Sequence, residues 1–253
     1  MPEASVVSIA VVCEADADRR IACGLADRVI CAQVDWISAE VLDSYRVFRG
    51  WELSEPYLEW RKVRSLAAQA GIRAHGHFRG EPGAPDASAA RRALLLLLVS
   101  SPPPDAVLLI RDSDGDEDRR RGLKQARGER AWQFAIAIGV AHTKRECWVL
   151  NGFEPSDDQE RKLLAEEQRK LGLDPCSASD RLTAKHDSDK LSAKRIFRVL
   201  TEGDKAREEP CWVRSDLTML RDRGRSTGLA EYLSELQDRI VPLFGPTTTS
   251  GPG

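Results

Sequence analysis

The sequence has no long apolar run, no signal-like start and few histidines. Its most hydrophobic stretch, Ala93 to Val99, is far shorter than the roughly 20 residues that a membrane-spanning helix needs. The first residues also lack the basic and then apolar order of a secretory signal. We therefore expect a cytoplasmic protein that does not bind a membrane.

Several sequence patterns that would indicate a function class are also missing. The 6 cysteines are scattered, without a Cys-x-x-Cys pair or zinc-finger spacing, so the sequence predicts reduced thiols. With 38 basic and 40 acidic residues the net charge is -2, which gives no global positive field to attract nucleic acid. A nucleotide-binding P-loop is absent, so the chain is not expected to be an ATPase by itself.

What the sequence does contain is an alternation of apolar β-branched runs with amphipathic segments, in a chain of 253 residues that is long enough to bury a substantial core. Ser5 to Cys13 and Asp105 to Arg111 are predicted as strands buried on both faces of a parallel sheet. Phe134 to His142 is either a third strand or the tail of a helix. Helices are predicted over 16–26, 55–70, 86–99 and from 117 onward. This order favours an α/β fold with a mainly parallel sheet flanked by helices.

The organisation along the chain follows from changes in composition. Residues 1–150 are predicted to form the α/β core, with an aromatic-rich insertion at about 34–85 that includes a short strand over 71–80. Residues 151–244 are predicted as a helical C-terminal region packed on the core, with a helix from a Ser156 cap to Gly172 and further helices over 187–200 and 227–244. The tail, 245–253, is too poor in apolar residues to pack and is predicted to be disordered.

Acidic residues follow both of the strongest strands. Glu14 comes directly after the first, and Asp112, Asp114 and Asp116 alternate after the second. The carboxyl ends of parallel strands meet at one edge of a sheet, so we expect these carboxylates to lie close together. Carboxylates are the preferred ligands of Mg²⁺ or Mn²⁺, and these four are the candidate metal ligands, with Asp116 auxiliary. A solvated turn is the alternative for the aspartates.

An EF-hand is excluded for the same stretch. Counting from Asp112, its loop would require glycine where Glu117 stands and glutamate where Leu123 stands.

Three segments in order carry a family resemblance: "VVCEADADRRIACGLA", "LLIRDSDGDEDR" and "AHTKRECWVLNGF". Together they resemble the TOPRIM domain of topoisomerases, primases and OLD-type nucleases, and small bacterial TOPRIM-like proteins. The resemblance implies a TOPRIM-like sheet with a helical C-terminal extension, acid/base chemistry at Glu14 and a divalent metal at Asp112 and Asp114. The resemblance also includes a Glu-x-Trp element after the Asp-x-Asp pair, here Glu146-Cys147-Trp148. Glu146 is expected to complete the group of acidic residues. Ala15 stands where many of these domains have glycine.

The candidate site residues follow from these two lines of argument. The candidate catalytic residues are Glu14, Asp112, Asp114, Glu146 and Lys190. The resemblance implies that one lysine of Lys185, Lys190 and Lys194 stabilises transition-state charge, and the sequence does not say which. The candidate nucleic-acid-binding residues are Arg119, Arg120, Arg121, Lys124, Lys185 and Lys194. A surface glutamate at position 146 and a solvated basic helix are the alternatives. Asp16 and Asp18 are interpreted as ordinary acids of a first helical turn.

The function predicted from this reasoning is a Mg²⁺- or Mn²⁺-dependent nuclease that hydrolyses phosphodiester bonds in DNA or RNA. The OLD-type resemblance implies a separate ATPase partner acting in trans and a role in antiviral defence, and it leaves a homo-oligomer open. The second hypothesis is a non-catalytic TOPRIM interaction module that docks on an SMC- or ABC-type ATPase. A D-x-D-x-T phosphatase ranks last, because Asp116 stands where threonine is expected.

Overall fold

The computed structural model describes residues 6–184 and 186–245, and its centre is a parallel sheet. The strand order is β2, β1, β6, β7, and β3 also pairs with β1. The strands are β1 (Val7–Cys13), β2 (Arg46–Arg49), β3 (Leu58–Glu59), β6 (Ala106–Asp112) and β7 (Ala135–Ala141). The predicted α/β fold with a mainly parallel sheet flanked by helices is confirmed, and the ambiguous segment 134–142 supplies a strand.

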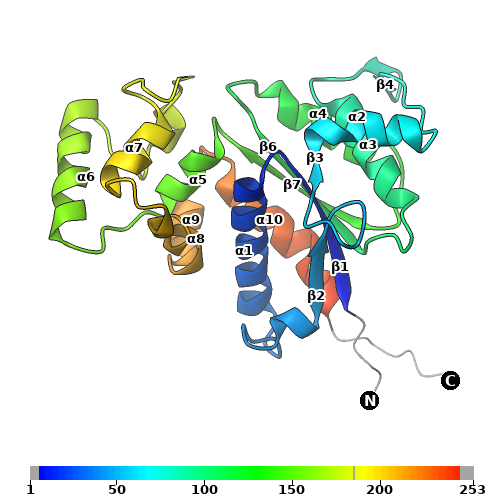
Figure 1. Ribbon diagram of the computed structural model, residues 1–253, viewed down its shortest axis with the longest axis horizontal. Helices are drawn as coiled ribbons and strands as arrows, with labels where there is room; N and C mark the ends of the chain where they lie inside the picture. The colour runs from blue at the N-terminus through cyan, green and yellow to red at the C-terminus, as the bar shows by residue number, and fades with distance from the viewer. Residues whose placement is uncertain (1–5, 185, 246–253) are drawn as a thin grey trace.

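Alternate side chains of the strands enter two separate apolar layers, as the pleat of a strand requires. Ile9 and Leu108 belong to the layer beneath α1 (Asp16–Gln33) and α10 (Leu229–Arg239). Ala10 and Leu109 belong to the opposite layer, which is covered by three other helices (Figure 1). These are α2 (Trp60–Gln69), α3 (Ala87–Leu98) and α4 (Asp118–Gly128). Both faces of the sheet are therefore buried, which explains the continuous apolar runs of its strands.

The insertion between α1 and α3 completes one edge of the sheet. β2 pairs with the first half of β1 and β3 with its end, so the helix expected from residue 55 begins only at Trp60. The strand expected over 71–80 is reduced to β4 (His77–Phe78), which pairs with β5 (Glu81–Pro82) in a small antiparallel hairpin outside the main sheet. The first boundary was set by the long-range pairing of β3 with β1, and the second by the local turn that pairs β4 with β5.

The C-terminal half is helical. It contains α5 (Arg145–Asn151), α6 (Asp158–Leu171), α7 (Ala193–Leu200), α8 (Pro210–Val213), α9 (Leu217–Arg223) and α10. The cap of α6 is Asp157, which accepts a hydrogen bond from Glu160 N at 2.8 Å, so the prediction of Ser156 was wrong. Ser156 instead donates to the Glu160 carboxylate at 3.0 Å. Residues 246–253, nearly all of the expected tail, lie outside the described residues.

The last helix ties this half to the sheet. Tyr232 of α10 stacks on Trp148 of α5 with ring centroids 5.2 Å apart, and its hydroxyl donates to Ala22 O in α1 at 3.0 Å. Trp148 donates its indole N–H to Thr227 O at 2.8 Å. Residues from both ends of the chain therefore share one core. None of the helices in the described part of the chain is long and apolar enough to cross a membrane.

Candidate acidic site at the carboxyl end of the sheet

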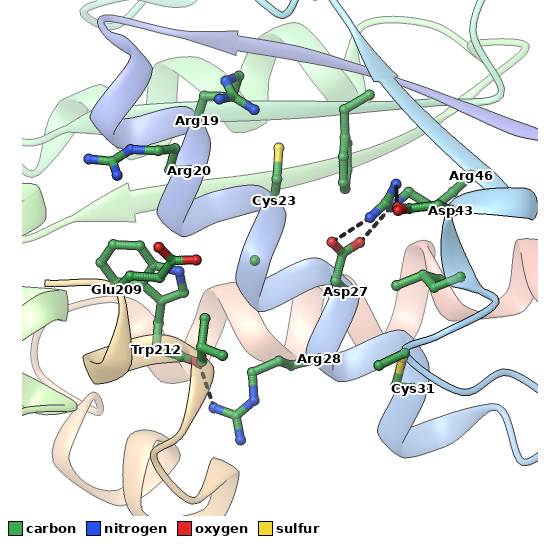
Figure 2. Close-up of a pocket in the computed structure, with 15 residues that line it drawn as sticks. Arg19, Arg20, Cys23, Asp27, Arg28, Cys31, Asp43, Arg46, Glu209 and Trp212 are labelled. Atoms are coloured by element: carbon green, nitrogen blue, oxygen red, sulfur yellow. Dashed lines mark hydrogen bonds and ion pairs between the residues drawn. The ribbon is translucent and has the colours of Figure 1, made fainter. Parts of the chain in front are cut away.

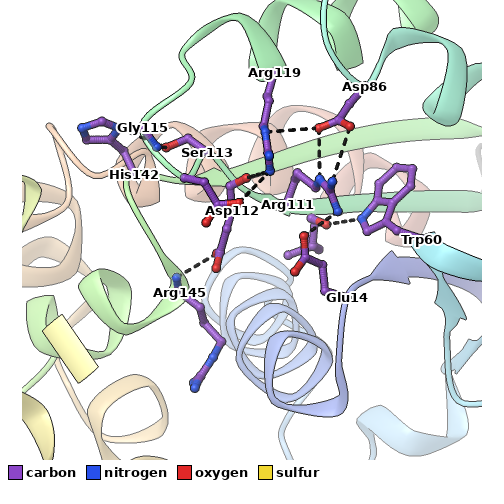
Figure 3. Close-up of polar contacts among 12 residues, drawn as sticks. Glu14, Trp60, Asp86, Arg111, Asp112, Ser113, Gly115, Arg119, His142 and Arg145 are labelled. Atoms are coloured by element: carbon purple, nitrogen blue, oxygen red, sulfur yellow. Dashed lines mark hydrogen bonds and ion pairs between the residues drawn. The ribbon is translucent and has the colours of Figure 1, made fainter. Parts of the chain in front are cut away.

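Adjacent parallel strands bring the predicted acids to one edge of the sheet. β1 lies beside β6 with Val12 opposite Leu109, so the chain after Cys13 emerges next to the end of β6. Glu14 there lies 2.5 Å from the guanidinium of Arg111, measured from Oε1 to Nη1 (Figure 3). The structure thus places Glu14 beside the residues that precede the Asp112-x-Asp114 pair.

Asp112 stands at the centre of a cluster of carboxylates. Its Oδ1 accepts a hydrogen bond from the backbone N–H of Arg145 at 2.8 Å. Burial raises the pKa of Asp112 well above its ordinary value, and the charges of four neighbouring carboxylates raise it further. In order of effect these are Asp18, Glu146, Glu14 and Asp114. We call these five residues the acid cluster; it contains the four predicted catalytic acids.

Asp18 is the member that the sequence interpretation missed. Its Oδ2 accepts a hydrogen bond from the backbone N–H of Ala15 at 2.9 Å, which satisfies a donor at the start of α1. Burial also raises its pKa, an effect that Arg145 opposes and that Glu14 and Glu146 reinforce. The available signal was its spacing, because Asp18 lies one helical turn after Glu14. Asp18 therefore both caps α1 and adds charge to the acid cluster.

Arg145 is a cation placed within the acid cluster. Its guanidinium lies 3.2 Å from Glu146 and 3.5 Å from Asp18, and it also contacts Glu208. The side chain is only 13% exposed. Burial by itself would lower the pKa of Arg145, but Glu146, Glu208 and Asp18 outweigh that effect and raise it. Arg145 thus neutralises part of the negative charge on the α5 side of the site.

Asp114 reaches the site from a tight turn. Asp114 and Gly115 have φ angles of 50° and 82°, a left-handed conformation that glycine and aspartate tolerate best. The Asp114 carboxylate lies 2.9 Å from a guanidinium nitrogen of Arg119. Asp116 is exposed, and its carboxylate accepts a hydrogen bond from the backbone N–H of Asp118 at 3.0 Å at the start of α4. The predicted auxiliary ligand is therefore engaged at the end of a helix and is not one of the five residues of the acid cluster.

The predicted nucleic-acid-binding residues of α4 point in different directions. Arg119 faces the acid cluster, where it also donates to the backbone oxygen of Asp112 at 3.0 Å. Arg120 and Lys124 both pair with Glu231 of α10 and so join α4 to the core. Arg121 is 63% exposed. Within this block, Arg119 is the residue that contacts the acids.

The three lysines expected near the site do not lie together. Lys194 of α7 pairs with Asp187 at 2.5 Å, which raises the pKa of Lys194, and the charge of Glu146 adds to this effect. Lys194 and Glu146 line one pocket of about 230 Å³. Lys190 is exposed in the loop before α7, and Lys185 lies outside the described residues. The structure thus places Lys194, and not Lys190, beside a member of the acid cluster.

Two further pockets open on either side of the acid cluster. One, of about 390 Å³, is lined by Glu14, Trp60, Arg111 and residues of α2 and α3. The other, of about 260 Å³, is lined by Asp114, Lys144 and their neighbours. Both give a ligand access to cluster residues from solvent.

A larger pocket of about 660 Å³ runs along α1, away from these acids (Figure 2). Its charged side chains are mostly paired with one another or with backbone. Arg46 makes two contacts of 2.7 Å with Asp27, and Arg28 donates to Trp212 O at 2.6 Å. None of the candidate site residues lines this pocket. We therefore take the acid cluster as the candidate site.

In residues 6–184 and 186–245, no group of three or more His, Cys, Asp or Glu side chains is arranged to hold a metal ion. Mg²⁺ usually keeps several waters and binds through one or two carboxylates, which does not require such a group. Asp112 and Asp114 offer the right oxygen donors, and a cation there would relieve the repulsion that raises the pKa of Asp112. By this chemistry the pair fits a hydrated Mg²⁺ or Mn²⁺.

Comparisons of the chain with protein-family models, with curated proteins and with solved structures found no match. We therefore infer function from the residues of the acid cluster and from the three sequence segments that contain them.

Proposed function

We propose that this protein is a Mg²⁺- or Mn²⁺-dependent hydrolase of phosphodiester bonds in DNA or RNA. One observation carries the proposal: the Asp112 carboxylate ends a central strand among four other carboxylates that raise its pKa. Gathering like charges lowers the stability of the folded protein, and a bound cation would offset that cost. The arrangement favours metal chemistry over a purely structural role.

The proposed division of work follows the positions of the residues. Mg²⁺ held by Asp112 and Asp114 would polarise a phosphate oxygen and activate a water molecule. Glu14 follows β1 and contacts Arg111, and its charge acts on Asp112; in this proposal it would move a proton to or from the attacking or leaving oxygen. Lys194 and Lys144 line the pockets at Glu146 and Asp114, where their charge favours a phosphate backbone. Among the lysines, this geometry supports Lys194 more than Lys190.

The cellular role is proposed from the TOPRIM resemblance alone. OLD-type domains act beside an ATPase, and this sequence has no P-loop. We therefore propose a separate ATPase partner and a role as the effector of an antiviral defence system.

A second candidate function is a non-catalytic module that docks on an SMC- or ABC-type ATPase. Its specific support is that arginines already neutralise the acids without a metal. Arg111 pairs with Glu14, and Arg119 pairs with Asp114. Arg145 pairs with Glu146 and Asp18. A cluster balanced in this way is compatible with a metal-free structural role.

The test combines cleavage with metal binding. Purified protein is incubated with supercoiled plasmid and with bulk tRNA in Mg²⁺ or Mn²⁺, and Mn²⁺ binding is measured by calorimetry. Asp112→Asn and Glu14→Gln keep the shape of the side chains and remove charge. We expect each to lower the cleavage rate by about 100-fold or more, the range for lost acid/base or metal ligands. Asp118→Asn, exposed at the start of α4, is the matched control and should retain the parental rate.

The outcomes separate the two functions. Cleavage that is lost in the Asp112 and Glu14 variants supports the hydrolase. Cleavage at the parental rate in both variants would remove these residues from the mechanism. A parent chain that neither cuts nor binds Mn²⁺ would favour the docking module.

A further inference from the structure

Five charged side chains alternate in sign across the edge of the sheet. Glu14 contacts Arg111 at 2.5 Å, and Arg111 contacts Asp86 at 3.0 Å. Asp86 in turn lies 3.7 Å from Arg119 (Figure 3). Arg119 lies 2.9 Å from Asp114. The two ends of this series belong to the acid cluster, and its centre, Asp86, comes from the distant start of α3. We call the series the arginine bridge.

Asp86 is held in place by packing that is independent of the acid cluster. It precedes α3 in a left-handed conformation with φ of 63°. Next to it, Gly122 of α4 packs so closely on the carbonyl oxygen of Pro85 that a side chain at position 122 would collide with it. Gln125 of α4 also accepts a hydrogen bond from the backbone N–H of Ala84 at 2.8 Å. Asp86 is thereby fixed beside the α4 residue Arg119, one turn before Gly122.

Each arginine of the bridge contacts Asp86 and one acid of the cluster, and Arg119 also donates to the Asp112 backbone oxygen at 3.0 Å. Asp86 makes two contacts with Arg111, at 3.0 and 3.4 Å, which leaves Nη1 of Arg111 for Glu14. The two arginine side chains are 18% and 22% exposed, and Arg111 also lines the pocket of about 390 Å³. Their charged ends can therefore be reached by a ligand while Asp86 keeps them at the edge of the sheet.

We propose that Arg111 and Arg119 are a phosphate-binding pair positioned by Asp86, and that in the metal-free protein they occupy Glu14 and Asp114 in place of the cation. Arginine is the side chain best suited to bind phosphate oxygens through paired N–H groups. A cation held by Asp112 and Asp114 competes with Arg119 for Asp114, and its positive charge weakens the neighbouring pair of Arg111 with Glu14, so its binding releases N–H groups of both arginines. Phosphate and cation then favour each other's binding, and this coupling is reciprocal. The inference rests on the proposed function for its ligand, a phosphodiester.

Two binding measurements on the full chain test the bridge without any activity assay. Mn²⁺ affinity is measured by calorimetry, and binding of a fluorescein-labelled 12-residue oligothymidylate is measured by anisotropy in Ca²⁺ and in chelator. In the parent chain we expect the oligonucleotide to bind about fivefold or more tightly with Ca²⁺ than with chelator, the lower end of typical couplings.

The variants are chosen so that the two affinities move in predicted directions. Arg111→Gln and Arg119→Gln remove the competing cation, so Mn²⁺ should bind more tightly while the oligonucleotide binds more weakly. Asp86→Asn removes the anchor, so the arginines should hold the acid cluster more firmly and both affinities should fall. Arg161→Gln, at an exposed arginine of α6 that pairs with Asp158, is the matched control and should change neither. Circular dichroism and thermal unfolding check that each variant is folded.

Opposite movement of the two affinities in the arginine variants separates this inference from a structural role, which would weaken both together. Mn²⁺ binding that is unchanged or weaker in Arg111→Gln and Arg119→Gln would overturn the bridge, even if the parent cuts nucleic acid. A parent chain that binds no Mn²⁺ would overturn the bridge and the proposed hydrolase alike.

Discussion

At the scale of single residues, the acid cluster lowers the stability of the folded protein and supplies the carboxylates that the proposed function requires. Burial of Asp112 disfavours its ionised form and so raises its pKa, and the charges of Asp18, Glu146 and Glu14 add to this effect. Such a site resembles those in which proteins retain a destabilising group because their chemistry needs it. This cost can be measured, because removing one of the charges should raise the free energy of unfolding.

Asp112→Asn is expected to stabilise the metal-free protein. Asparagine keeps an oxygen that can accept from Arg145 N and removes the charge, so we expect the free energy of unfolding to rise by about 0.5–2 kcal/mol, the range for such relief. Chemical denaturation in chelator measures the change. Asp118→Asn, where the carboxylate is 54% exposed, should stay near the parental value. A destabilised Asp112→Asn protein would contradict the account of its raised pKa.

This stabilisation should depend on pH. Because the pKa of Asp112 is raised in the folded state, the folded protein binds that proton more tightly than the unfolded chain. Stability contributed at this position therefore falls as pH rises from the ordinary carboxyl pKa to the raised one. The gain from Asp112→Asn should be largest above the raised pKa and shrink on acidification. Unfolding curves of parent and variant, measured at a series of pH values upward from the ordinary carboxyl pKa, give the difference.

The affinity for Mn²⁺ should depend on the ionisation of the same residue, Asp112. A carboxylate must be ionised to bind a metal, so the affinity of the parent chain for Mn²⁺ should rise as pH increases through the raised pKa of Asp112. Calorimetry at several pH values, in buffers of different ionisation enthalpy, would also detect the released proton. An affinity that stays constant over this range would mean that Asp112 is not a ligand.

At the scale of helices and strands, the close contact between α4 and the segment before α3 decides the geometry of the site. Gly122 allows the backbone of α4 to approach Pro85, and Arg119 then lies beside Asp86. Glycine costs helix stability relative to alanine, so its place within α4 is explained by packing.

Gly122→Ala is therefore expected to destabilise the protein although alanine favours a helix. Its Cβ would collide with a backbone carbonyl that cannot rotate away, and such overpacking typically costs about 1–3 kcal/mol. Thermal and denaturant unfolding measure the loss. Gly128→Ala, at the end of the same helix with open space around it, is the matched control and should be neutral or slightly stabilising. A neutral Gly122→Ala would mean that α4 and α3 can separate at little cost.

At the scale of the whole molecule, the two halves of the chain share one core. α10 packs on β7 and α1, and Tyr232 links α5 to α1 through its ring and its hydroxyl. The site lies where these parts meet, since α1, β6 and α5 each supply members of the acid cluster. A substitution in the buried face of α10 should therefore destabilise the whole fold and not the C-terminal half alone.

Tyr232→Ala is expected to lower the free energy of unfolding by about 3–5 kcal/mol, as for other large buried aromatic residues. Because the core is shared, unfolding should remain a single transition with coincident far-ultraviolet circular dichroism and tryptophan fluorescence curves. Tyr232→Phe removes only the hydrogen bond to Ala22 O and should cost about 1 kcal/mol. Separate transitions would show that the C-terminal half unfolds by itself.

The sequence by itself determined the central strands and the position of the acids that follow them. The apolar runs that became β1 and β6 are local patterns, and parallel pairing of neighbouring strands then places Glu14 near Asp112 and Asp114. The resemblance of the motifs pointed to the same edge of the sheet and to Glu146. These inferences need only the period of a strand and the direction of its neighbours.

Only the tertiary structure decided which cations and further acids meet this edge. Asp18, Arg145 and Asp86 reach the site through helix packing and cap geometry between distant segments, which no local period encodes. The same packing directed Arg120 and Lys124 toward α10 and left Arg119 facing the acids. The role of a charged side chain depends on the charged groups that folding places within a few ångströms of it, and those neighbours depend on the whole fold.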